Sequence, residues 1–400
     1  MTSANSEAAR KIGQARPLWT GVSRLDRIIG RRRVLLHAGP PFENRADIPP
    51  LLRNSLAFAC VYEGWAKTWE EADALVLSND IELGAGQDFA VLLPLAGVAS
   101  PSMALIEVSS STAPAISAWS VLNEGGSCAS RLGLRNMELP AHHAWLNGPF
   151  ADWLAALFTE PMELYPLLTE AIRNGDDGHA AVSAGSMAMV EALSRRTDRP
   201  IPSAISTFVN TNTSFAINIW MAMAAAVLGQ AAGTVDSTVV VQAGGNGFQY
   251  GLKLARSPKR WFKMEGPRPT GNLDPGRQER LPARGIGDSA VIDFLGLGGQ
   301  LIGEKSPIFQ GLRHVLPHRH IERRHLFKCA TLSGLGDLTG GVDAQAVVSS
   351  GQGPVVLLGM LDPEGRDGRI GGGMIEVPVA LFARALDDAV DQTNDAENVP

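Results

Sequence analysis

The sequence predicts an α+β fold in which a helical domain is inserted between two α/β-type domains. The chain has 400 residues, about twice the usual domain length, so we expect two or three folded units. Strand patterns disappear between residues 149 and 233, where apolar residues recur at helical spacing. On both sides of that stretch, short apolar runs alternate with helical patterns. We therefore expect an N-terminal α/β domain over residues 1–148, a helical domain over 149–233 and a C-terminal α/β domain with glycine-rich loops over 234–400.

The N-terminal domain is predicted to begin with a short buried strand at residues 33–36. The loop that follows, residues 37–41, lies at a strand end, where binding backbone is often found. A helical segment is predicted over residues 49–77, because the apolar spacing there is nearer 3.6 than 2. Further strands are predicted at residues 89–95 and 104–108, on either side of a turn of small residues.

The helical domain contains a stretch, residues 200–236, that carries no charge between its ends. Its length alone would allow a membrane helix, but Asn218 and Gln230 interrupt it and no basic flank follows. We therefore expect a helix buried in a core or a subunit interface. Helices are predicted at residues 150–158, 163–172, 183–193 and 214–228.

The C-terminal domain returns to strand patterns. Residues 238–242 and 248–254 predict a hairpin around the turn at 244–247. Residues 266–287 predict a long loop rich in proline, glycine and arginine. A strand at 355–360, a glycine-rich turn through Gly373 and an amphipathic helix at 377–390 complete the expected elements.

Composition narrows the class of function. The net charge of −6 argues against a nucleic-acid binder or a protein held on an anionic membrane, since both need a basic surface. Small anionic substrates are compatible with it. The cysteines Cys60, Cys128 and Cys329 are odd in number and widely spaced, so they predict neither a disulfide framework nor a zinc site, and the cytosol fits best.

Two glycine-rich segments carry candidate binding chemistry. In the first, Asp288 and Ser289 lie between flexible backbone stretches whose amides can form an anion-binding concavity. The alternative is that one of these two side chains caps the helix containing Asp293. The second segment, residues 362–373, surrounds its glycines with charges of both signs, which suits a zwitterionic or amide substrate but also an ordinary exposed turn.

Half of the histidines lie between residues 314 and 325, among four arginines. Because the arginines would repel a metal cation, a zinc site is disfavoured there, and an anion or partner surface or a solvated face remains. His143 and His179 are isolated and, taken alone, are more often structural than catalytic. The chain has no nucleophile elbow, no HExxH and no P-loop lysine, so hydrolysis by a serine or a metal has no sequence signature.

Read in order, the motifs resemble those of the AllG/YlbE-like family from about residue 15 to about residue 392. The segments that carry the resemblance are residues 35–41 (LLHAGPP), 63–66 (EGWA), 100–103 (SPSM), 123–125 (NEG), 245–246 before Phe248, 287–289 (GDS), and the C-terminal glycines with Pro378.

The resemblance implies a cytosolic α+β protein with an inserted helical domain that acts as a subunit of oxamate carbamoyltransferase in anaerobic allantoin breakdown, a branch of purine catabolism. The implied reaction interconverts oxalurate plus phosphate with oxamate plus carbamoyl phosphate. It implies companion subunits, one of them FdrA-like, and a homo-oligomer is also expected. No metal, cofactor or covalent nucleophile is required, because carbamoyl transfer needs cationic and N–H groups, a base and exclusion of water.

Carried onto this chain, the family motifs predict two sets of site residues. The expected catalytic residues are Glu63, His143, His179 and Asp288. The expected substrate-binding residues are His37, Gly39, Asn123, Glu124, Asn246, Ser289 and Asp362.

The chain departs from the family pattern at several positions. It has Ala181 and Val182 where the pattern has arginine and asparagine, and Asp362 where the pattern has histidine. Three functions therefore stay open: carbamoyl transfer to this or a related ureido compound, amide hydrolysis on the same scaffold, and a non-catalytic assembly subunit.

Overall fold

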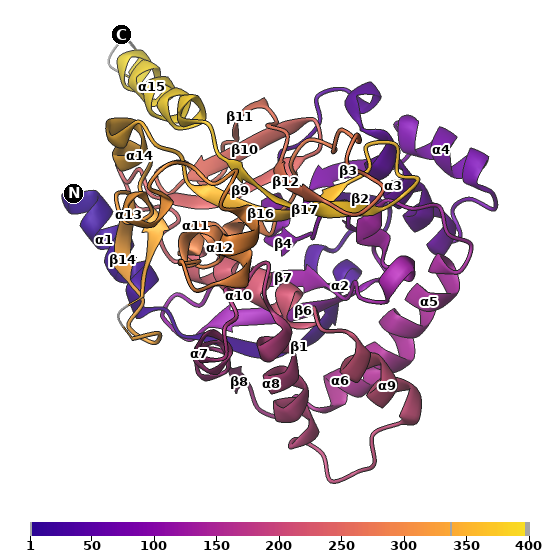
Figure 1. Ribbon diagram of the computed structural model, residues 1–400. Coiled ribbons are helices and arrows are strands. Elements are labelled where there is room, and N and C mark those ends of the chain that lie inside the picture. Colours follow the sequence, from indigo (N-terminus) through magenta and orange to yellow (C-terminus); the bar gives the residue numbers. More distant parts are fainter. Residues whose placement is uncertain (1, 337, 397–400) are drawn as a thin grey trace.

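The structure, a computed structural model, describes residues 2–336 and 338–396. It confirms the α+β fold, with 39% of residues in helices and 21% in strands. Within the described residues the strands form five sheets, and Figure 1 shows helix α10 between them near the centre of the molecule. The first helix, α1 (Ser3–Gln14), packs on strand β14 (Lys328–Thr331), so the start of the chain contacts its C-terminal third.

The largest sheet has the strand order β4-β7-β6-β1-β8. Its centre is antiparallel, and β4 joins β7 in parallel. Buried and partly buried residues alternate along most of β1, as expected for a strand with one face on the core. The strands are β1 (Pro17–Arg24), β4 (Val91–Leu92), β6 (Ala104–Ser110), β7 (Ser117–Val121) and β8 (Met162–Glu163).

A smaller sheet holds the predicted strand that leads to His37. Strand β2 (Val34–His37) lies between β3 (Glu82–Ala85), which is parallel to it, and β5 (Val98–Ala99), which is antiparallel. The helical segment predicted over residues 49–77 is two helices, because Gly64 has a φ of 69° and Thr68 caps the second helix through its side chain. The helices of this part are α2 (Leu25–Ile29), α3 (Pro50–Tyr62) and α4 (Trp69–Leu77).

The segment predicted to be a helical domain contains helices and the short strand β8, which pairs with β1 of the large sheet. One helix, α9, was not predicted. The division into three domains stays a prediction. The helices are α5 (Leu139–Trp145), which leads into it through a π-helical turn (Leu146–Phe150), α6 (Ala151–Ala156), α7 (Tyr165–Arg173), α8 (Ser183–Ser194), α9 (Ser203–Thr211) and α10 (Ala216–Gly229).

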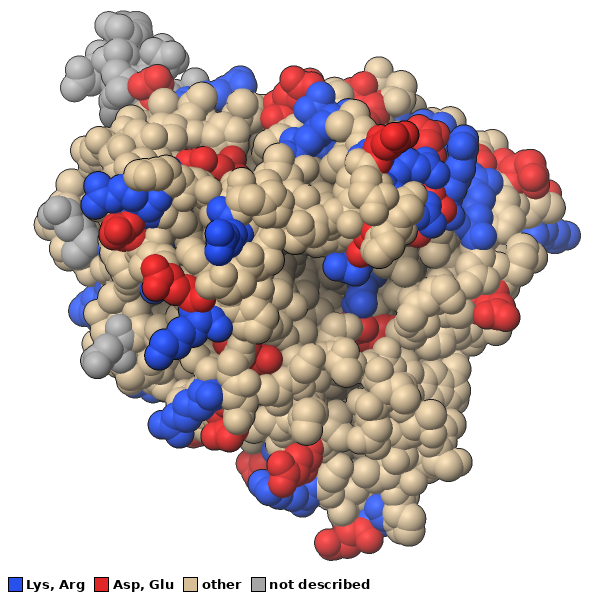
Figure 2. All heavy atoms as spheres, viewed as in Figure 1, with Lys and Arg blue, Asp and Glu red and all other residues tan. Residues whose placement is uncertain are grey.

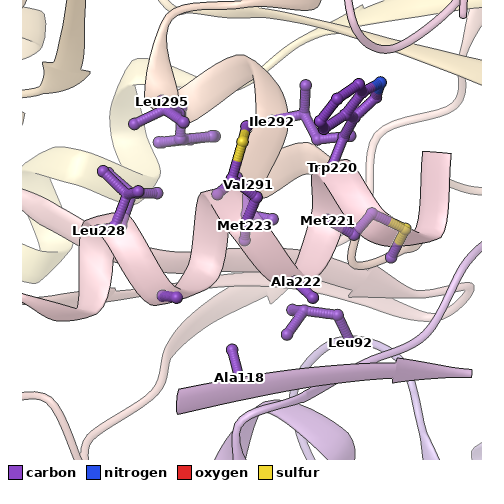
Figure 3. Close-up of a cluster of buried hydrophobic side chains, with 14 of the residues drawn as sticks. Leu92, Ala118, Trp220, Met221, Ala222, Met223, Leu228, Val291, Ile292 and Leu295 are labelled. Carbon is purple, nitrogen blue, oxygen red and sulfur yellow. The ribbon is translucent and has the colours of Figure 1, made fainter. Parts of the chain in front are cut away.

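Helix α10 forms the centre of the core. Figure 3 shows its side chains packed between α11 on one side, through Ile292 and Leu295, and strands of the large sheet on the other, through Leu92 and Ala118. Trp220 is fully buried. This confirms a buried helix in the charge-free stretch. In the described part of the chain no single helix has the length and hydropathy to cross a membrane, and only α9 and α10 taken together, bent by 71°, meet those criteria.

The C-terminal part contributes three sheets. The predicted hairpin is present as β9 and β10, which belong to a four-stranded sheet with the order β11-β10-β9-β13. A second sheet has the order β12-β17-β16. The strands of the C-terminal part are β9 (Val240–Asn246), β10 (Gln249–Leu254), β11 (Phe262–Glu265), β12 (Thr270–Leu273), β13 (Ile286–Gly287), β15 (Thr339–Val342), which pairs with β14, β16 (Val355–Leu361) and β17 (Arg369–Glu376). Its helices are α11 (Ala290–Leu295), α12 (Pro307–Leu312), α13 (His320–Arg323), α14 (Ala344–Ser350) and α15 (Val379–Ala396).

The glycine-rich turn predicted through Gly373 is shorter than expected: residues 363–368 form the turn, and Gly371, Gly372 and Gly373 belong to strand β17. Strand β17 pairs with β12 on one edge and with β16 on the other. A Cβ on Gly373 would lie 2.3 Å from the carbonyl oxygen of Thr270 in β12. Glycine is needed here because the backbones approach too closely for a side chain. The long loop predicted at residues 266–287 likewise contains the strands β12 and β13.

Candidate functional site

A cavity of about 400 Å³ lies where β12, β16 and β17 meet helix α12 and the starts of α10 and α11. Its polar and charged lining comes from Arg131, His179, Ser214, Asn272, Asp274, Ser289 and Arg369. Figure 2 shows a hollow near the middle of this face, with Lys or Arg side chains on its wall. Two of the predicted site residues, His179 and Ser289, therefore line one cavity.

His179 is held by a buried carboxylate. Its Nδ1 lies 2.6 Å from Oδ2 of Asp293, and both side chains are almost fully buried. Burial alone would lower the pKa of His179, but the charge and hydrogen bond of Asp293, with the charge of Asp177, outweigh it and raise the pKa. The other ring nitrogen, Nε2, forms no hydrogen bond with any described residue, which leaves it for a ligand in the cavity.

The backbone around this pair explains how two residues 114 positions apart meet. Asp177 accepts hydrogen bonds from the N–H groups of His179 and Ala180 at 2.7 and 2.8 Å, which fixes the turn before α8. Gly298 has a φ of 51°, and a Cβ there would lie 2.4 Å from Asp293 Oδ1 and 2.9 Å from Cβ of His179. The absence of a side chain at Gly298 is thus a condition for the contact.

Asp288 does not line the cavity but holds a loop that forms part of its wall. Its carboxylate accepts hydrogen bonds from the N–H groups of Gly39 (2.8 Å) and Leu93 (2.9 Å) and from the side chain of Gln87 (2.6 Å). Burial raises its pKa to about 7, although these three bonds lower it. The loop held in this way presents Pro94 and Leu95 to the cavity, and Leu95 has a left-handed φ of 48°.

Ser289 directly follows Asp288 and stands at the N-cap position, one residue before α11. Neither side chain caps that helix, so the capping alternative raised for this pair is wrong. The hydroxyl of Ser289 makes no capping bond and lies at the cavity. It can therefore donate a hydrogen bond to a ligand.

Asn123 and Glu124 act on the cavity through Arg131. Glu124 is buried and forms a bidentate ion pair with Arg131, and its Oε2 also accepts from Ser214 at 2.8 Å. The side chain of Asn123 accepts from the backbone N–H of Arg131 at 3.1 Å. Arg131, 17% exposed, is thus a guanidinium fixed in one orientation at the cavity.

Arg369 is the second guanidinium of the cavity, and it is held loosely. Its Nη1 lies 4.0 Å from Asp274, and both side chains are about half exposed. The side chain of Arg369 runs beside two glycines. A Cβ on Gly359 would lie 3.7 Å from Arg369 Nε, and a Cβ on Gly372 would lie 3.1 Å from Arg369 Nη2. Glycine at these two positions leaves room for the side chain and for a ligand beside it.

His37, Gly39 and Asn246 lie near Asp288 and do not line the cavity. The N–H of Gly39 is bound to Asp288, and Asn246 donates to the carbonyl of Pro40 at 2.8 Å. His37 is fully buried with Nδ1 2.8 Å from the carbonyl oxygen of Ala38, and burial lowers its pKa to about 4. These residues hold the loop after β2 against the β9–β10 hairpin.

Glu63, His143 and Asp362 lie elsewhere. Glu63 accepts from the side chains of Ser100 and Ser102 at 2.6 and 2.7 Å. His143 is buried among aromatic rings, Phe58 at 4.7 Å being one of them, and burial lowers its pKa to about 3. Asp362 accepts from the N–H of Arg366 at 2.8 Å and closes the turn before β17.

Sequence reasoning missed Arg131 as a cavity residue, and it treated Asp293 only as part of a helix. Both roles depend on contacts between distant segments that no local pattern reveals. Arg369 could have been found, since it lies in the second glycine-rich segment with charges of both signs. In the described part of the chain, no group of three or more His, Cys, Asp or Glu side chains is arranged to hold a metal ion.

Comparisons with known proteins connect this geometry to a family. Residues 81–289, just over half of the chain, match the family described as oxamate carbamoyltransferase subunit AllG. The AllG subunit of Escherichia coli (strain K12) is 24% identical, with 96% of each chain covered. The uncharacterized protein YahG of the same organism is 26% identical over 96% of this chain and 85% of its own length.

Among solved structures, the fold is shared with a conserved protein of unknown function from Enterococcus faecalis V583, with a TM-score of 0.86, 24% identity and 97% of each chain covered. The residues matched by the family include three that line the cavity, Arg131, His179 and Ser289. They also include β4, the strand before the loop that presents Pro94 and Leu95 to the cavity. The chain therefore belongs to the AllG family of oxamate carbamoyltransferase subunits.

Proposed function

We propose that this chain is a subunit of an enzyme that transfers a carbamoyl group between phosphate and a small amide, and that the transfer takes place in the cavity described above. The proposed reaction interconverts oxalurate plus phosphate with oxamate plus carbamoyl phosphate, or the equivalent pair for a related ureido compound. The observation that carries the proposal is that two guanidinium groups and one imidazole, those of Arg131, Arg369 and His179, line a single cavity.

The arginines suit the charges of these substrates. Oxamate and oxalurate carry a carboxylate, and phosphate and carbamoyl phosphate carry a phosphoryl group. Guanidinium groups bind both kinds of anion through paired N–H donors. Arg131 uses its two Nη groups on Glu124, Asn123 and Ser214 and offers its Nε–H to a small carboxylate, whereas the more exposed Arg369 can place paired donors on a phosphoryl group.

His179 fits the proton transfer that the reaction requires. When hydrogen phosphate attacks the ureido carbonyl carbon, a C–O bond forms, the C–N bond breaks, phosphate loses one proton and the departing amide nitrogen gains one. The net number of protons is unchanged. An imidazole whose Nδ1 is fixed by Asp293 can accept the first proton at Nε2 and deliver it to the nitrogen.

Ser289 completes the proposed arrangement. Negative charge develops on the carbonyl oxygen as the tetrahedral intermediate forms, and a hydrogen-bond donor placed there stabilises it. The hydroxyl of Ser289 makes no capping bond, so it is free to act as that donor. The other predicted site residues, Asp288 and Glu124, would then act by positioning Leu95 and Arg131.

The family description of this chain as a subunit supports assembly with other chains. We propose that it works in the cytoplasm in a complex with companion subunits, one of them FdrA-like, and forms a homo-oligomer within it. Membranes and nucleic acids have no part in this proposal.

The test is a carbamoyl-transfer assay. Purified chain, alone and with its companion subunits, is incubated with oxamate and carbamoyl phosphate, and release of phosphate and formation of oxalurate are followed. Arg369→Lys should raise KM several-fold, because lysine cannot form a bidentate contact. Arg199→Lys, an exposed arginine away from the cavity, is the matched control. Phosphate release without oxalurate would indicate hydrolysis, and no turnover in any subunit combination would refute the proposal.

A further inference from the structure

A second hollow lies on the other side of helix α12 from the first cavity. Pro307, Ile308 and Gly311 of α12 line the first cavity, whereas Phe309 of the same helix and Arg313 just after it line the second. Residues three and four apart share one face of a helix, so this six-residue helix presents opposite faces to the two hollows. We call the second hollow the α12 groove, and its lining residues fall between 303 and 324.

The α12 groove is positively charged in a protein that is negative overall. Its lining has four arginine and lysine side chains and two glutamates, a net charge of +2 with histidines neutral, against −6 for the whole chain. The cations are Lys305, Arg313, Arg319 and Arg324. This lining contains much of the segment rich in histidine and arginine between residues 314 and 325. The proposed function gives that segment no role.

These cations are poorly compensated. Among the described residues, Lys305 and Arg313 form no ion pair, and Arg319 has only the exposed Glu322 at 3.7 Å. Arg324 is bound by two backbone carbonyls, those of Leu301 and Ile302, and has no carboxylate partner among the described residues. The guanidinium of Arg324 is thus fixed in place while its charge stays unpaired.

Groups behind the groove respond to this charge. Burial, with a smaller contribution from the charge of Arg324, lowers the pKa of Lys328 to about 7. Burial also lowers the pKa of His320 to about 4, again with Arg324 contributing, and the Nε2 of this 5% exposed histidine has no hydrogen-bond partner. An anion in the groove would relieve the repulsion that these groups share.

The groove also offers apolar surface. The half-buried side chains of Phe309, Leu316 and Ile321 lie in its lining, beside the cations. A ligand with both an anionic and an apolar part would use the whole lining, since small-molecule sites combine an apolar surface with a few charged groups.

We propose that the α12 groove is a second ligand site, separate from the first cavity, that binds a small phosphorylated organic molecule. The phosphate lies among Lys305, Arg313 and Arg324, and the organic part lies on Phe309, Leu316 and Ile321. Such a ligand contacts the helix that forms one wall of the first cavity, so its binding alters the mobility of α12.

The test uses phenyl phosphate and inorganic phosphate as probes, with binding to the whole chain measured by calorimetry at low salt. Phenyl phosphate should bind more tightly, because only it reaches the apolar side chains. The double variant Lys305→Ala/Arg313→Ala should weaken its binding about tenfold through loss of two charged contacts. The control, Lys67→Ala/Arg199→Ala, removes the same charge from exposed positions elsewhere and should leave binding unchanged.

A third variant separates the two cavities. Arg369→Ala should leave phenyl phosphate bound at the groove, and hydrogen exchange in residues 303–324 should slow with the probe present. If Arg369→Ala abolishes binding and the groove variant does not, the probe occupies the first cavity and the proposal is wrong. Equal binding of both phosphates, equal loss in groove and control variants, or no binding to the unaltered chain would also overturn it. None of these results depends on carbamoyl transfer.

Discussion

His179 and Asp293 are the residues on which the proposed chemistry depends most. Their contact is made at 2.6 Å inside the core, with no more than 4% of either side chain exposed. A carboxylate in this position fixes the tautomer and the orientation of the imidazole and stabilises its protonated form. The same contact contributes to the stability of the fold, which gives a test that does not require substrate.

The pKa of His179 predicts how that stability depends on pH. Its folded value is raised above the value of 6.5 in an unfolded chain, so protonation favours the folded state. The stabilising contribution of the protonated His179 is full below the unfolded pKa of 6.5 and is lost as the pH rises through the folded pKa. His179→Gln should therefore lower the free energy of unfolding more at about pH 6 than at about pH 9, as measured by urea denaturation. An equal loss at both values would contradict the assigned ion pair. His314→Gln, at an exposed position, should show no such difference.

Asp288 predicts a second effect at a single residue. Both of its oxygens accept hydrogen bonds, from two backbone N–H groups and one side-chain amide. In Asp288→Asn an NH₂ group would replace one acceptor and face a donor, so we expect a loss of about 2–4 kcal/mol in the free energy of unfolding. Denaturation at about pH 8, where the carboxylate is ionised, measures it. Asp198→Asn, exposed in the turn after α8, is the control; if both variants are equally stable, Asp288 does not hold the loop.

At the scale of elements, the packing of β12, β17 and β16 decides the shape of the cavity. Two neighbouring glycines of β17 differ in what a side chain would meet. At Gly373 a Cβ would lie 2.3 Å from a backbone oxygen of β12, whereas at Gly372 it would meet only the end of the Arg369 side chain, at 3.1 Å. Backbone cannot move aside as easily as a flexible side chain.

This difference predicts opposite outcomes for two alanine substitutions. Gly373→Ala should destabilise the protein by about 1–3 kcal/mol, because β12 must separate from β17. Gly372→Ala should change stability by less than about 0.5 kcal/mol and instead raise KM for the anionic substrate by displacing Arg369. Thermal unfolding and the transfer assay together separate the two. Equal stability losses in the two variants would show that the close contact between Gly373 and β12 does not determine the loss of stability.

Elements with a strong local pattern were predictable, and contacts between them were not. The charge-free run around Trp220 predicted a buried helix because an apolar surface on every side must be covered. Gly371 to Gly373 were expected in a turn because glycine is common there, while the close approach of β12 that requires them depends on strand pairing. His179 and Ser289 were predicted through family motifs, but Asp293 and Arg131 complete the site through contacts with residues 114 and 83 positions away.

At the scale of the whole molecule, one hydrophobic cluster connects all three segments of the chain. It includes Trp19 from the first, Trp220 from the second and Val240 from the third, each fully buried. A core shared in this way couples the segments, even though the sequence predicts three domains. The segments should therefore not unfold independently.

The expected result is a single unfolding transition. Thermal unfolding followed by far-UV and near-UV circular dichroism should give coincident curves, since loss of α10 exposes the faces of its neighbours at once. Two separate transitions, with helical signal lost first, would instead support an independent helical domain at residues 149–233.

The central claim is that His179 transfers a proton during carbamoyl transfer in the cavity. The most direct test compares kcat for the unaltered chain, His179→Gln and His314→Gln, each assembled with the companion subunits and supplied with oxamate and carbamoyl phosphate. We expect His179→Gln to lower kcat by about 10²–10⁴ without abolishing assembly, and His314→Gln to have no effect. Full activity in correctly folded His179→Gln would contradict the account.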